Sequence, residues 1–567
     1  MSIEVNFSPN SCDFGAVPAR RKKYVRVAVT VGDPFSAGRN VRVKVSRPVT
    51  TPDQFVPLAA LGWEAVGTNA VQSPLVRIGG ALLPTVYLLV SLSESLVLGP
   101  LAGSLQLSVV DEAGNPLPDS ERVLNVSGSI SAAQTVTLAL VIDRSTSMGE
   151  LLAGESRVRR ALSAATALLA LMEDTDRLGI VSFAAEATEL LSIGTLNQMI
   201  GTSTRRQVAQ TLLDPVNLNP AFLTPPGQPT CIYAGVQKGR IMLYLSPGAD
   251  KNLIVLTDGL EDYGNSVSKL PQLPDTYAIG VPSLNTTSLS WLTSANGYLS
   301  VDGAVTGDVL FKVQKYAAQI FANVSNTTIV VDPDQALPAS PQAFFDLEFS
   351  TTELDEEFKV VVFAKEPERL TLEPITAPSP HSKAETATAA DLSTGPARSY
   401  ESPRSLKVQS VERSDGVMLT RLSNDPDPAG LRPASRSVRL QRIGKDEKPS
   451  TTPFSYLVIA KSDLVLDAQV HASSPRVGGE LLLTAVLFEA GLPITERARV
   501  QAEVRYPEGV CSELKLSEDI EGRFTARLET LRPGLYEVRF KAQGKTVFGT
   551  AFHREQLRTV AIQPARC

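Results

Sequence analysis

Hydrophobic and polar residues follow three different patterns along this chain of 567 residues. Residues 1–131 contain short alternating or apolar runs, such as YVRVAVTV and TVYLLVSLS, which Gly, Pro, Asn and Asp residues separate. A period of two predicts β-strands, and several short strands joined by turns predict a β-sandwich. We therefore predict an N-terminal β-sandwich over residues 1–131.

Residues 134–325 form a second region, in which buried strands alternate with amphipathic helices. Apolar residues recur at helical spacing over 157–172 and again over 307–324. Further strands are predicted at the short apolar runs 177–183, 252–256 and 277–281. Strands that alternate with helices predict a doubly wound α/β domain with a mostly parallel sheet.

The pattern returns to short strands after residue 325. Residues 326–462 predict another β-sandwich, and residues 463–556 predict a further one because turn signals recur at roughly 8–12-residue intervals. Residues 377–404 are rich in Ala, Thr, Ser and Pro and have no apolar period, which predicts a disordered loop. Residues 557–567 are predicted to be a short C-terminal tail.

The pattern leaves open how the α/β domain is joined to its flanks. It is either an independent unit or an insertion into one sandwich that both flanks build. In the second case, strands from 84–131 and 326–372 would pair with each other.

Charge and composition narrow the class of protein. The formal net charge is −6, and no region has the basic excess that nucleic-acid binding requires. The basic cluster Arg20–Lys23 precedes an alternating run, so we interpret it as a solvated strand end, with a phosphate or lipid contact as the alternative.

The N-terminus has no apolar segment typical of a signal peptide, and the most apolar stretch, 81–103, contains Pro84 and Glu94. We therefore expect a cytoplasmic protein without direct membrane insertion, and export by a route without a cleavable signal stays open. The four cysteines are far apart in the sequence and show no metal or disulfide spacing, which favours free thiols.

Candidate chemistry begins where the first strand of the α/β domain ends. The apolar run 136–142 stops at Asp143, and Ser145 and Ser147 follow at alternate positions. Ligands at the carboxyl ends of parallel strands are typical of α/β sheets, and oxygen ligands suit a hard cation such as Mg2+. The sequence therefore predicts a metal site at this edge of the sheet.

Two later segments of the same domain carry matching residues. A threonine opens a helix in GQPTCIYAGV, and an aspartate follows the strand LIVLTDG. With the DxSxS element, these segments resemble the metal-ion-dependent adhesion site of von Willebrand factor A domains. The resemblance gives one set of metal-site residues, namely Asp143, Ser145, Ser147, Thr230 and Asp258.

The resemblance implies a role for each of these residues. The two serines would bind the cation through their hydroxyls, Thr230 would bind directly or through water, and the two aspartates would orient ligands or waters. The cation is expected to be Mg2+, with Ca2+ or Mn2+ as alternatives. Pro229 stands where the family has a glycine, and we expect it to restrict the movement of Thr230.

The same resemblance implies a function in cation-dependent protein recognition or adhesion. A partner protein would place an Asp or Glu carboxylate on the metal, and the helix at 307–324 would shift between states of low and high affinity. The flanking regions are similar to immunoglobulin-like domains of bacterial multidomain proteins. The alternative is a structural subunit of a larger assembly, in which the metal only stabilises the domain.

An enzymatic function is not expected. The chain contains three histidines, His381, His471 and His553, and none is near Ser145 in the sequence. Without a general base, no nucleophile–base pair is indicated. Glu261 and Asp262 can be read as paired carboxylates, but we interpret them as a solvated loop face.

Overall fold

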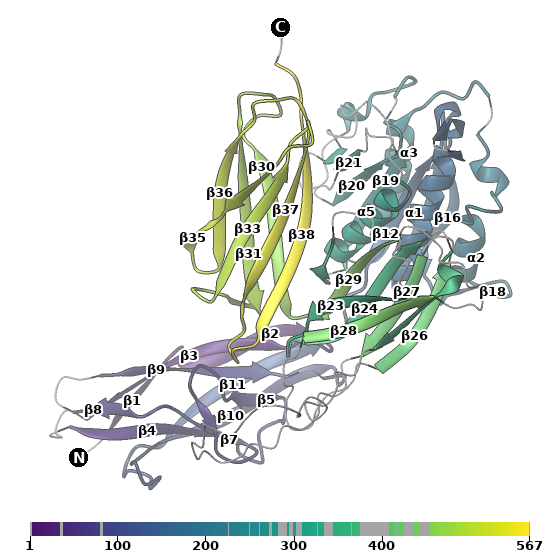
Figure 1. Cartoon of the computed structure of the whole chain (residues 1–567). Helices are drawn as coiled ribbons and strands as arrows, with labels where there is room; N and C mark the ends of the chain where they lie inside the picture. Colours follow the sequence, from purple (N-terminus) through teal and green to yellow (C-terminus); the bar gives the residue numbers. More distant parts are fainter. Residues whose placement is uncertain are drawn as a thin grey trace, which may run out of the picture.

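The structure is a computed structural model in which strand-rich units lie beside and below one α/β unit in the view of Figure 1. It describes residues 3–33, 38–79, 83–93, 95–152, 154–224, 226–248, 250–259, 261–270, 275–281, 292–293, 299–301, 309–325, 327–333, 344–364, 366–374, 407–414, 417–423, 435–442 and 454–565. The predicted loop 377–404 lies outside these residues, as do His381 and Cys567.

The N-terminal unit consists of two sheets that share one core. The described strands pair in the orders β1-β3-β9-β5 and β2-β11-β10-β4-β7-β6, with β8 beside β4. Valines and leucines of both sheets, among them Val27, Val43, Leu88 and Leu105, lie in this core. The strands are β1 Glu4–Ser8, β2 Ser11–Pro18, β3 Lys23–Gly32, β4 Arg39–Ser46, β5 Phe55–Leu58, β6 Glu64–Ala65, β7 Ala70–Gln72, β8 Val76–Ile78, β9 Thr85–Leu92, β10 Gly99–Val110 and β11 Arg122–Ser131.

The second unit contains the predicted α/β sheet. Its described strands lie in the order β16-β15-β12-β19-β20-β21 and are parallel except for β16 at one edge. The strands are β12 Thr137–Asp143, β13 Leu151–Leu152, β14 Glu155–Ser156, β15 Arg177–Phe183, β16 Ala187–Thr195, β17 Met199–Ile200, β18 Ser203–Thr204, β19 Lys251–Thr257, β20 Thr276–Gly280 and β21 Leu299–Val301. The helices are α1 Arg157–Leu171, α2 Arg205–Leu212, α3 Ile232–Leu245 and α5 Val309–Val324. The period of 3.6 thus correctly predicted α1 and α5.

Alternate residues of β12 face helices on opposite sides of the sheet. Leu140 packs in a core with α1 and α5, and Val141 packs in a core with α3. Two glycines bring α3 close to the strands, because a Cβ on Gly235 would lie 2.6 Å from the Phe183 ring and one on Gly239 would lie 2.6 Å from Leu253. This close packing fixes the start of α3 relative to the end of β12.

The remaining strands form a β-rich region in which one sheet is shared. Nine described strands lie in the order β26-β27-β24-β29-β22-β38-β37-β33-β34. We predicted a domain boundary between residues 462 and 463, but strands from both sides of that boundary belong to this one sheet. Smaller sheets, β23-β28-β25 and β30-β31-β36-β35 with β32, complete the region. The strands are β22 Thr328–Val331, β23 Phe344–Ser350, β24 Asp355–Ala364, β25 Leu370–Pro374, β26 Lys407–Ser414, β27 Val417–Ser423, β28 Ser435–Arg442, β29 Phe454–Ser462, β30 Leu464–Ala472, β31 Glu480–Glu489, β32 Leu492–Pro493, β33 Ala498–Arg505, β34 Cys511–Lys515, β35 Ser517–Ile520, β36 Arg523–Glu529, β37 Gly534–Lys545 and β38 Ala551–Ile562.

The predicted C-terminal tail is corrected by β38. This strand continues to Ile562 and pairs with β37 along its whole length (Figure 1). The sequence pattern did not predict this strand because one of its inward-facing residues is polar. Arg554 is fully buried, and its Nη2 atom lies 2.6 Å from Oδ1 of Asp355. A buried ion pair thus occupies a core position at which the strand pattern expects an apolar residue.

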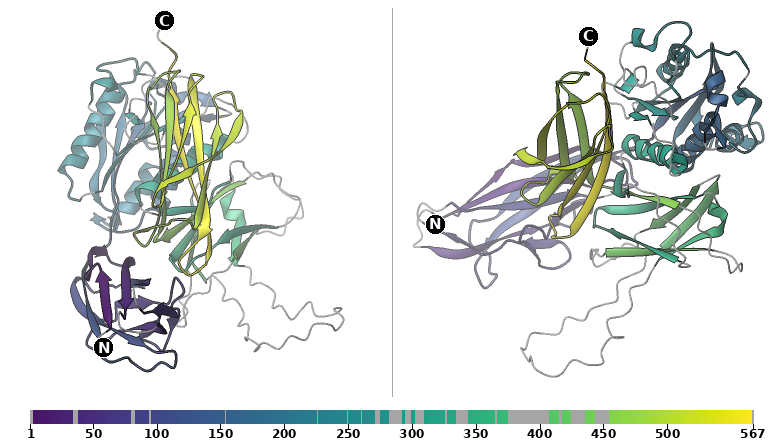
Figure 2. Two further views of the ribbon diagram at one scale, coloured as in Figure 1. Left: turned by 90° about the vertical axis from the view of Figure 1, so that its left-hand side faces the viewer. Right: turned by 45° about the horizontal axis from the view of Figure 1, so that its top comes forward.

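The α/β unit packs against the nine-stranded sheet. Apolar residues of α1 and α5, such as Leu168 and Ile320, share a core with Val361 and Leu419 of that sheet. Figure 2 shows this arrangement, with the helices lying over the strands. Lys359 of β24 also donates to the Leu171 carbonyl at 3.0 Å, at the end of α1.

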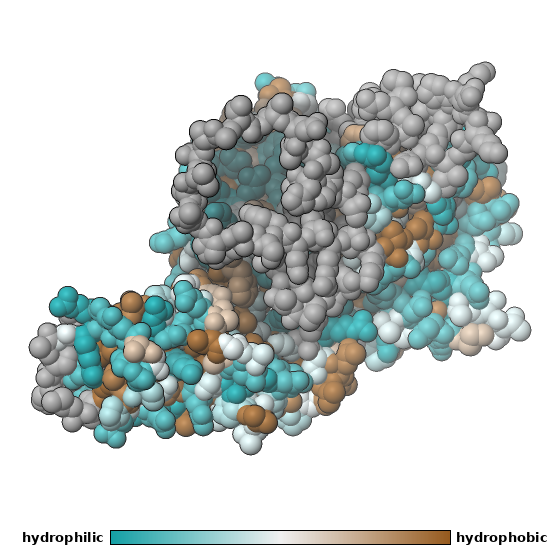
Figure 3. Space-filling model, turned by 60° about the horizontal axis from the view of Figure 1, so that its bottom comes forward, coloured by the Kyte–Doolittle hydropathy of each residue, from teal (hydrophilic) through white to brown (hydrophobic). Residues whose placement is uncertain are grey.

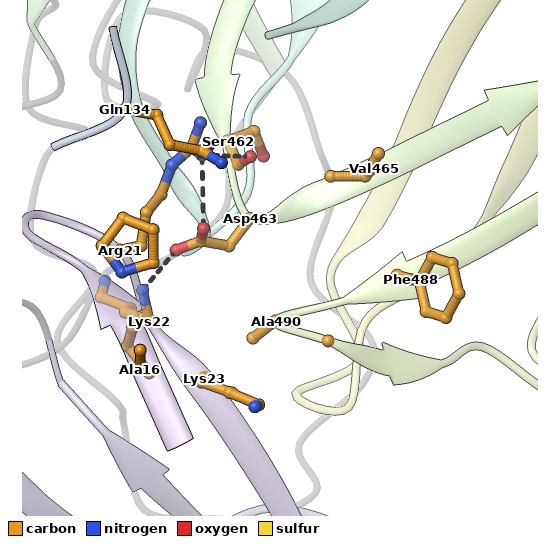
Figure 4. Close-up of a pocket in the computed structure, with 13 residues that line it drawn as sticks. Ala16, Arg21, Lys22, Lys23, Gln134, Ser462, Asp463, Val465, Phe488 and Ala490 are labelled. Carbon is orange, nitrogen blue, oxygen red and sulfur yellow. Dashed lines mark hydrogen bonds and ion pairs between the residues drawn. The ribbon is translucent and has the colours of Figure 1, made fainter. Parts of the chain in front are cut away.

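The basic cluster near residue 20 joins the N-terminal unit to the C-terminal one. Arg21 donates to the Ser462 carbonyl at 2.7 Å and pairs with Asp463 at 3.3 Å, and the Lys22 amide donates to Asp463 at 2.8 Å (Figure 4). Burial raises the pKa of Asp463, although Arg21 and Lys22 oppose this effect. These contacts border a cleft of about 400 Å³. Arg21 and Lys22 therefore bind another unit of the same chain and are not a solvated strand end.

On the face that Figure 3 shows, apolar residues of the N-terminal unit are scattered among hydrophilic ones. Among the described residues, no helix is long and apolar enough to cross a bilayer.

In the same residues Cys12, Cys231 and Cys511 are free thiols, as their spacing predicted.

A buried carboxylate connects α5 to the nine-stranded sheet. Asp332 is 2% exposed, and its oxygens lie 2.7 Å from Lys315 of α5 and 2.9 Å from Arg539 of β37. Burial alone would raise the pKa of Asp332, but Arg539 and Lys315 outweigh it and hold the pKa below its usual value. The carboxylate therefore stays charged and joins the two units.

Substitution Asp332→Ala is expected to lower the free energy of unfolding by about 3–5 kcal/mol, because it leaves two buried cations without their partner. Urea denaturation at pH 7 measures this loss. Since the folded pKa is lowered, the difference from wild type should shrink as the pH falls through the folded pKa. The control Asp519→Ala, which removes a surface ion pair with Arg523, should change stability little.

Candidate metal centre

The DxSxS element lies at the carboxyl end of β12, the strand between β15 and β19. Asp143 is the last residue of β12, and a short 3-10 helix, η1 Thr146–Gly149, follows. Oδ1 of Asp143 accepts from the Ser145 amide at 2.8 Å, which bends the chain so that the Ser145 and Ser147 hydroxyls lie 3.2 Å apart. The two predicted hydroxyl ligands therefore point to the same place.

The segment that carries Thr230 is hydrogen-bonded directly to this element. The Gln228 carbonyl accepts from the Thr146 amide at 3.0 Å, and the Gln228 amide donates to the Thr146 hydroxyl at 2.8 Å. Thr230 follows Pro229 and is 2% exposed, just before α3 begins. The structure thus brings Thr230 to the loop of the two serines, as the sequence predicted.

Asp258 reaches the same edge from β19. Thr257, its neighbour, donates from its hydroxyl to Oδ2 of Asp143 at 2.6 Å, so the ends of β12 and β19 are bonded through side chains. Asp258 is fully buried, and its Oδ2 atom lies 3.0 Å from Nη1 of Arg157. The structure brings all five predicted residues to one edge of the sheet.

Three contributions were missed by the sequence reasoning. Thr257 orients Asp143, Arg157 pairs with Asp258, and Asp262 accepts from the Thr230 amide at 2.6 Å. Glu261 accepts from the Val267 amide at 2.9 Å. Glu261 and Asp262 therefore hold loop backbones in place, and Asp262 is also exposed, as the interpretation of a solvated loop face expected. Their position just after the TDG segment was the available signal.

Two buried carboxylates lie at this edge, and the guanidinium of Arg157 pairs with one of them, Asp258. Burial, with a smaller contribution from the charge of Asp258, raises the pKa of Asp143 to about 7, although hydrogen bonds from Thr257 and Ser145 oppose the change. A hard cation would stabilise the ionised form of both groups. The electrostatics of this edge therefore fit a bound cation.

The donor chemistry also fits a hard cation. The five residues offer only oxygen atoms, the ligand type that Mg2+ prefers. Among the described residues, no group of three or more His, Cys, Asp and Glu side chains lies close enough to hold a metal. The candidate site has two such side chains, Asp143 and Asp258, and its other predicted donors are hydroxyls. The two described histidines, His471 and His553, are in β30 and β38, away from Ser145.

One family model matches the part of the chain that carries these residues. Residues 138–261 match the model of the von Willebrand factor type A domain. No curated protein matches the chain.

Several solved structures are similar to the chain at low identity. An aerotolerance-related membrane protein from Bacteroides fragilis is 20% identical over 33% of this chain and 99% of that one, with a TM-score of 0.26. A von Willebrand factor type A protein from Catenulispora acidiphila is 10% identical over 68% and 67%, with a TM-score of 0.26. The ArnB paralog VWA2 from Sulfolobus acidocaldarius is 10% identical over 82% and 72%, with a TM-score of 0.24.

The match covers β12, α1, β15, α3 and β19, which are the elements that position the five residues. The rest of the chain is rich in strands. Residues 138–261 therefore belong to the von Willebrand factor type A family, within a β-rich chain of several units.

Proposed function

We propose that this chain recognises a protein partner in a divalent-cation-dependent way. The cation, most simply Mg2+, would be held by the site residues Asp143, Ser145, Ser147, Thr230 and Asp258. With few carboxylates as direct ligands, Mg2+ would keep a coordination position for an Asp or Glu side chain of the partner. We further propose that the flanking sandwiches are immunoglobulin-like modules that present this domain.

One observation carries the proposal. The three segments that carry the candidate residues meet at the carboxyl ends of β12 and β19, where hydrogen bonds join the segment after β12 to Gln228 and to Thr257. The Ser145 and Ser147 hydroxyls face each other at 3.2 Å, so a cation beside them could contact both. Such preorganisation lowers the cost of ordering the site when a ligand arrives.

The surface around the site supports a protein partner. Leu151 is 73% exposed in the segment after η1, and Tyr263 is 55% exposed beside Thr230, whose carbonyl accepts from the Tyr263 amide at 3.1 Å. Leu223 is 52% exposed next to Thr224, which lies close to Gly149. Exposed apolar side chains that surround a polar centre are typical of protein-recognition surfaces.

Substitution Asp143→Ala is expected to weaken Mg2+ binding by about 10–100-fold, because the residue that orients Ser145 is lost. Isothermal titration calorimetry of the full chain measures the dissociation constant. The control Asp174→Ala removes a 70% exposed carboxylate of the same domain and should leave binding unchanged. Equal affinity of wild type and Asp143→Ala would contradict the assignment of the site.

A partner is expected to be retained by the wild-type chain in Mg2+ and lost in chelator. Immobilised wild type, Asp143→Ala and Tyr263→Ser chains would be compared, with bound proteins identified by mass spectrometry. A protein retained only by wild type in Mg2+, and weakened by Tyr263→Ser, agrees with recognition at this surface.

The same experiment addresses the structural-subunit alternative. In that case the β-rich units would make the contacts, and the same proteins would be retained by Asp143→Ala and in chelator. An enzymatic function would instead require turnover that Ser145→Ala abolishes. We expect no turnover on ester, peptide or phosphoester substrates.

A further inference from the structure

We infer that Arg157 is an internal cation of the candidate metal centre, which holds Asp258 when no divalent cation is bound and weakens binding of that cation. The inference rests on the proposed metal site and deepens it. It concerns a residue of this chain that lies outside the DxSxS pattern and that the resemblance did not assign.

The guanidinium of Arg157 contacts three parts of the centre. Nη1 lies 3.0 Å from Oδ2 of Asp258 and donates to the Ser147 carbonyl at 3.3 Å. Nη2 lies 2.9 Å from Oε2 of Glu150. The side chain is 18% exposed, whereas Asp258 is fully buried, so the pair with Asp258 is largely shielded from water.

Local structure explains why Arg157 reaches this position. It is the first residue of α1, and its amide donates to the Glu150 carbonyl at 3.1 Å, so the short β13–β14 hairpin returns the chain to the end of η1. The side chain then extends from the start of α1 toward the end of β19. The hairpin between η1 and α1 therefore makes this contact possible.

Charge decides the effect on a metal ion. When both are ionised, Asp143 and Asp258 would attract a cation, and the positive charge of Arg157, 3.0 Å from Asp258, offsets part of this attraction. A guanidinium within hydrogen-bonding distance of Asp258 also repels a divalent cation bound nearby, and this repulsion is strong where water is excluded. The same charge stabilises Asp258 when the cation is absent, since a buried carboxylate without a partner is costly.

Titration of the full chain with Mg2+ by calorimetry tests the inference. Arg157→Gln is expected to bind Mg2+ about tenfold more tightly than wild type, because one repulsive charge is removed. Arg157→Lys keeps the charge but loses the forked contacts of the guanidinium, so its affinity for Mg2+ should lie between those of wild type and Arg157→Gln. Arg159→Gln is the matched control, since Arg159 lies on the same helix with its side chain exposed. Unchanged or weaker binding by Arg157→Gln would overturn the inference.

Thermal unfolding in chelator provides a second readout. Arg157→Gln should lower the melting temperature in chelator more than Arg159→Gln does, and Mg2+ should restore most of that loss. In an Asp258→Asn background, Arg157→Gln should change the melting temperature much less, because the carboxylate that pairs with Arg157 has been replaced by a neutral amide. The same loss in both backgrounds would overturn the inference.

The two readouts separate this inference from the proposed function. If the wild-type chain binds no Mg2+, the proposed metal site is wrong. The comparison of Arg157→Gln in the wild-type and Asp258→Asn backgrounds still decides whether Arg157 stabilises Asp258.

Discussion

Two buried carboxylates at the end of a parallel sheet govern the candidate site. Asp143 and Asp258 end neighbouring strands and are fully buried, which is costly for charged groups. The surrounding loops compensate this cost with hydroxyls, a backbone amide and the guanidinium of Arg157. A divalent cation would complete the compensation.

The β-rich region determines how the α/β unit is held. One face of its sheet is covered by α1 and α5, which share a core with the nine-stranded sheet. Along α5, Lys312 and Tyr316 contact Glu537 at 3.1 and 2.9 Å, and Lys315 contacts Asp332. The resemblance implies that this helix shifts between affinity states. Such a shift would have to break these contacts, so the C-terminal unit would oppose it.

Patterns with a strong local signal were predictable from the sequence. The apolar run before Asp143 and the period of 3.6 over 157–172 correctly predicted β12 and α1, because buried central strands and amphipathic helices leave clear patterns. The five candidate site residues came from the resemblance to von Willebrand factor A domains, on segments that follow a predicted strand or precede a predicted helix.

Features that depend on contacts between distant segments were not predictable. Arg21 was interpreted as solvated, yet it binds Asp463, more than 400 residues away in the chain. The strand β38 was hidden because Arg554 faces a buried carboxylate. The role of Arg157 depends on the hairpin that returns the chain to η1, and nothing in its local sequence indicates a pairing with Asp258.

The most direct measurement for the central claim is anomalous scattering from crystals of the full chain grown with Mn2+, which replaces Mg2+ at oxygen sites. We predict one strong peak within coordination distance of the Ser145 and Ser147 hydroxyls and close to Thr230. The peak should vanish in Asp143→Ala crystals grown in the same way. A wild-type structure with no peak beside these residues, or with its ordered Mn2+ elsewhere, would contradict the account.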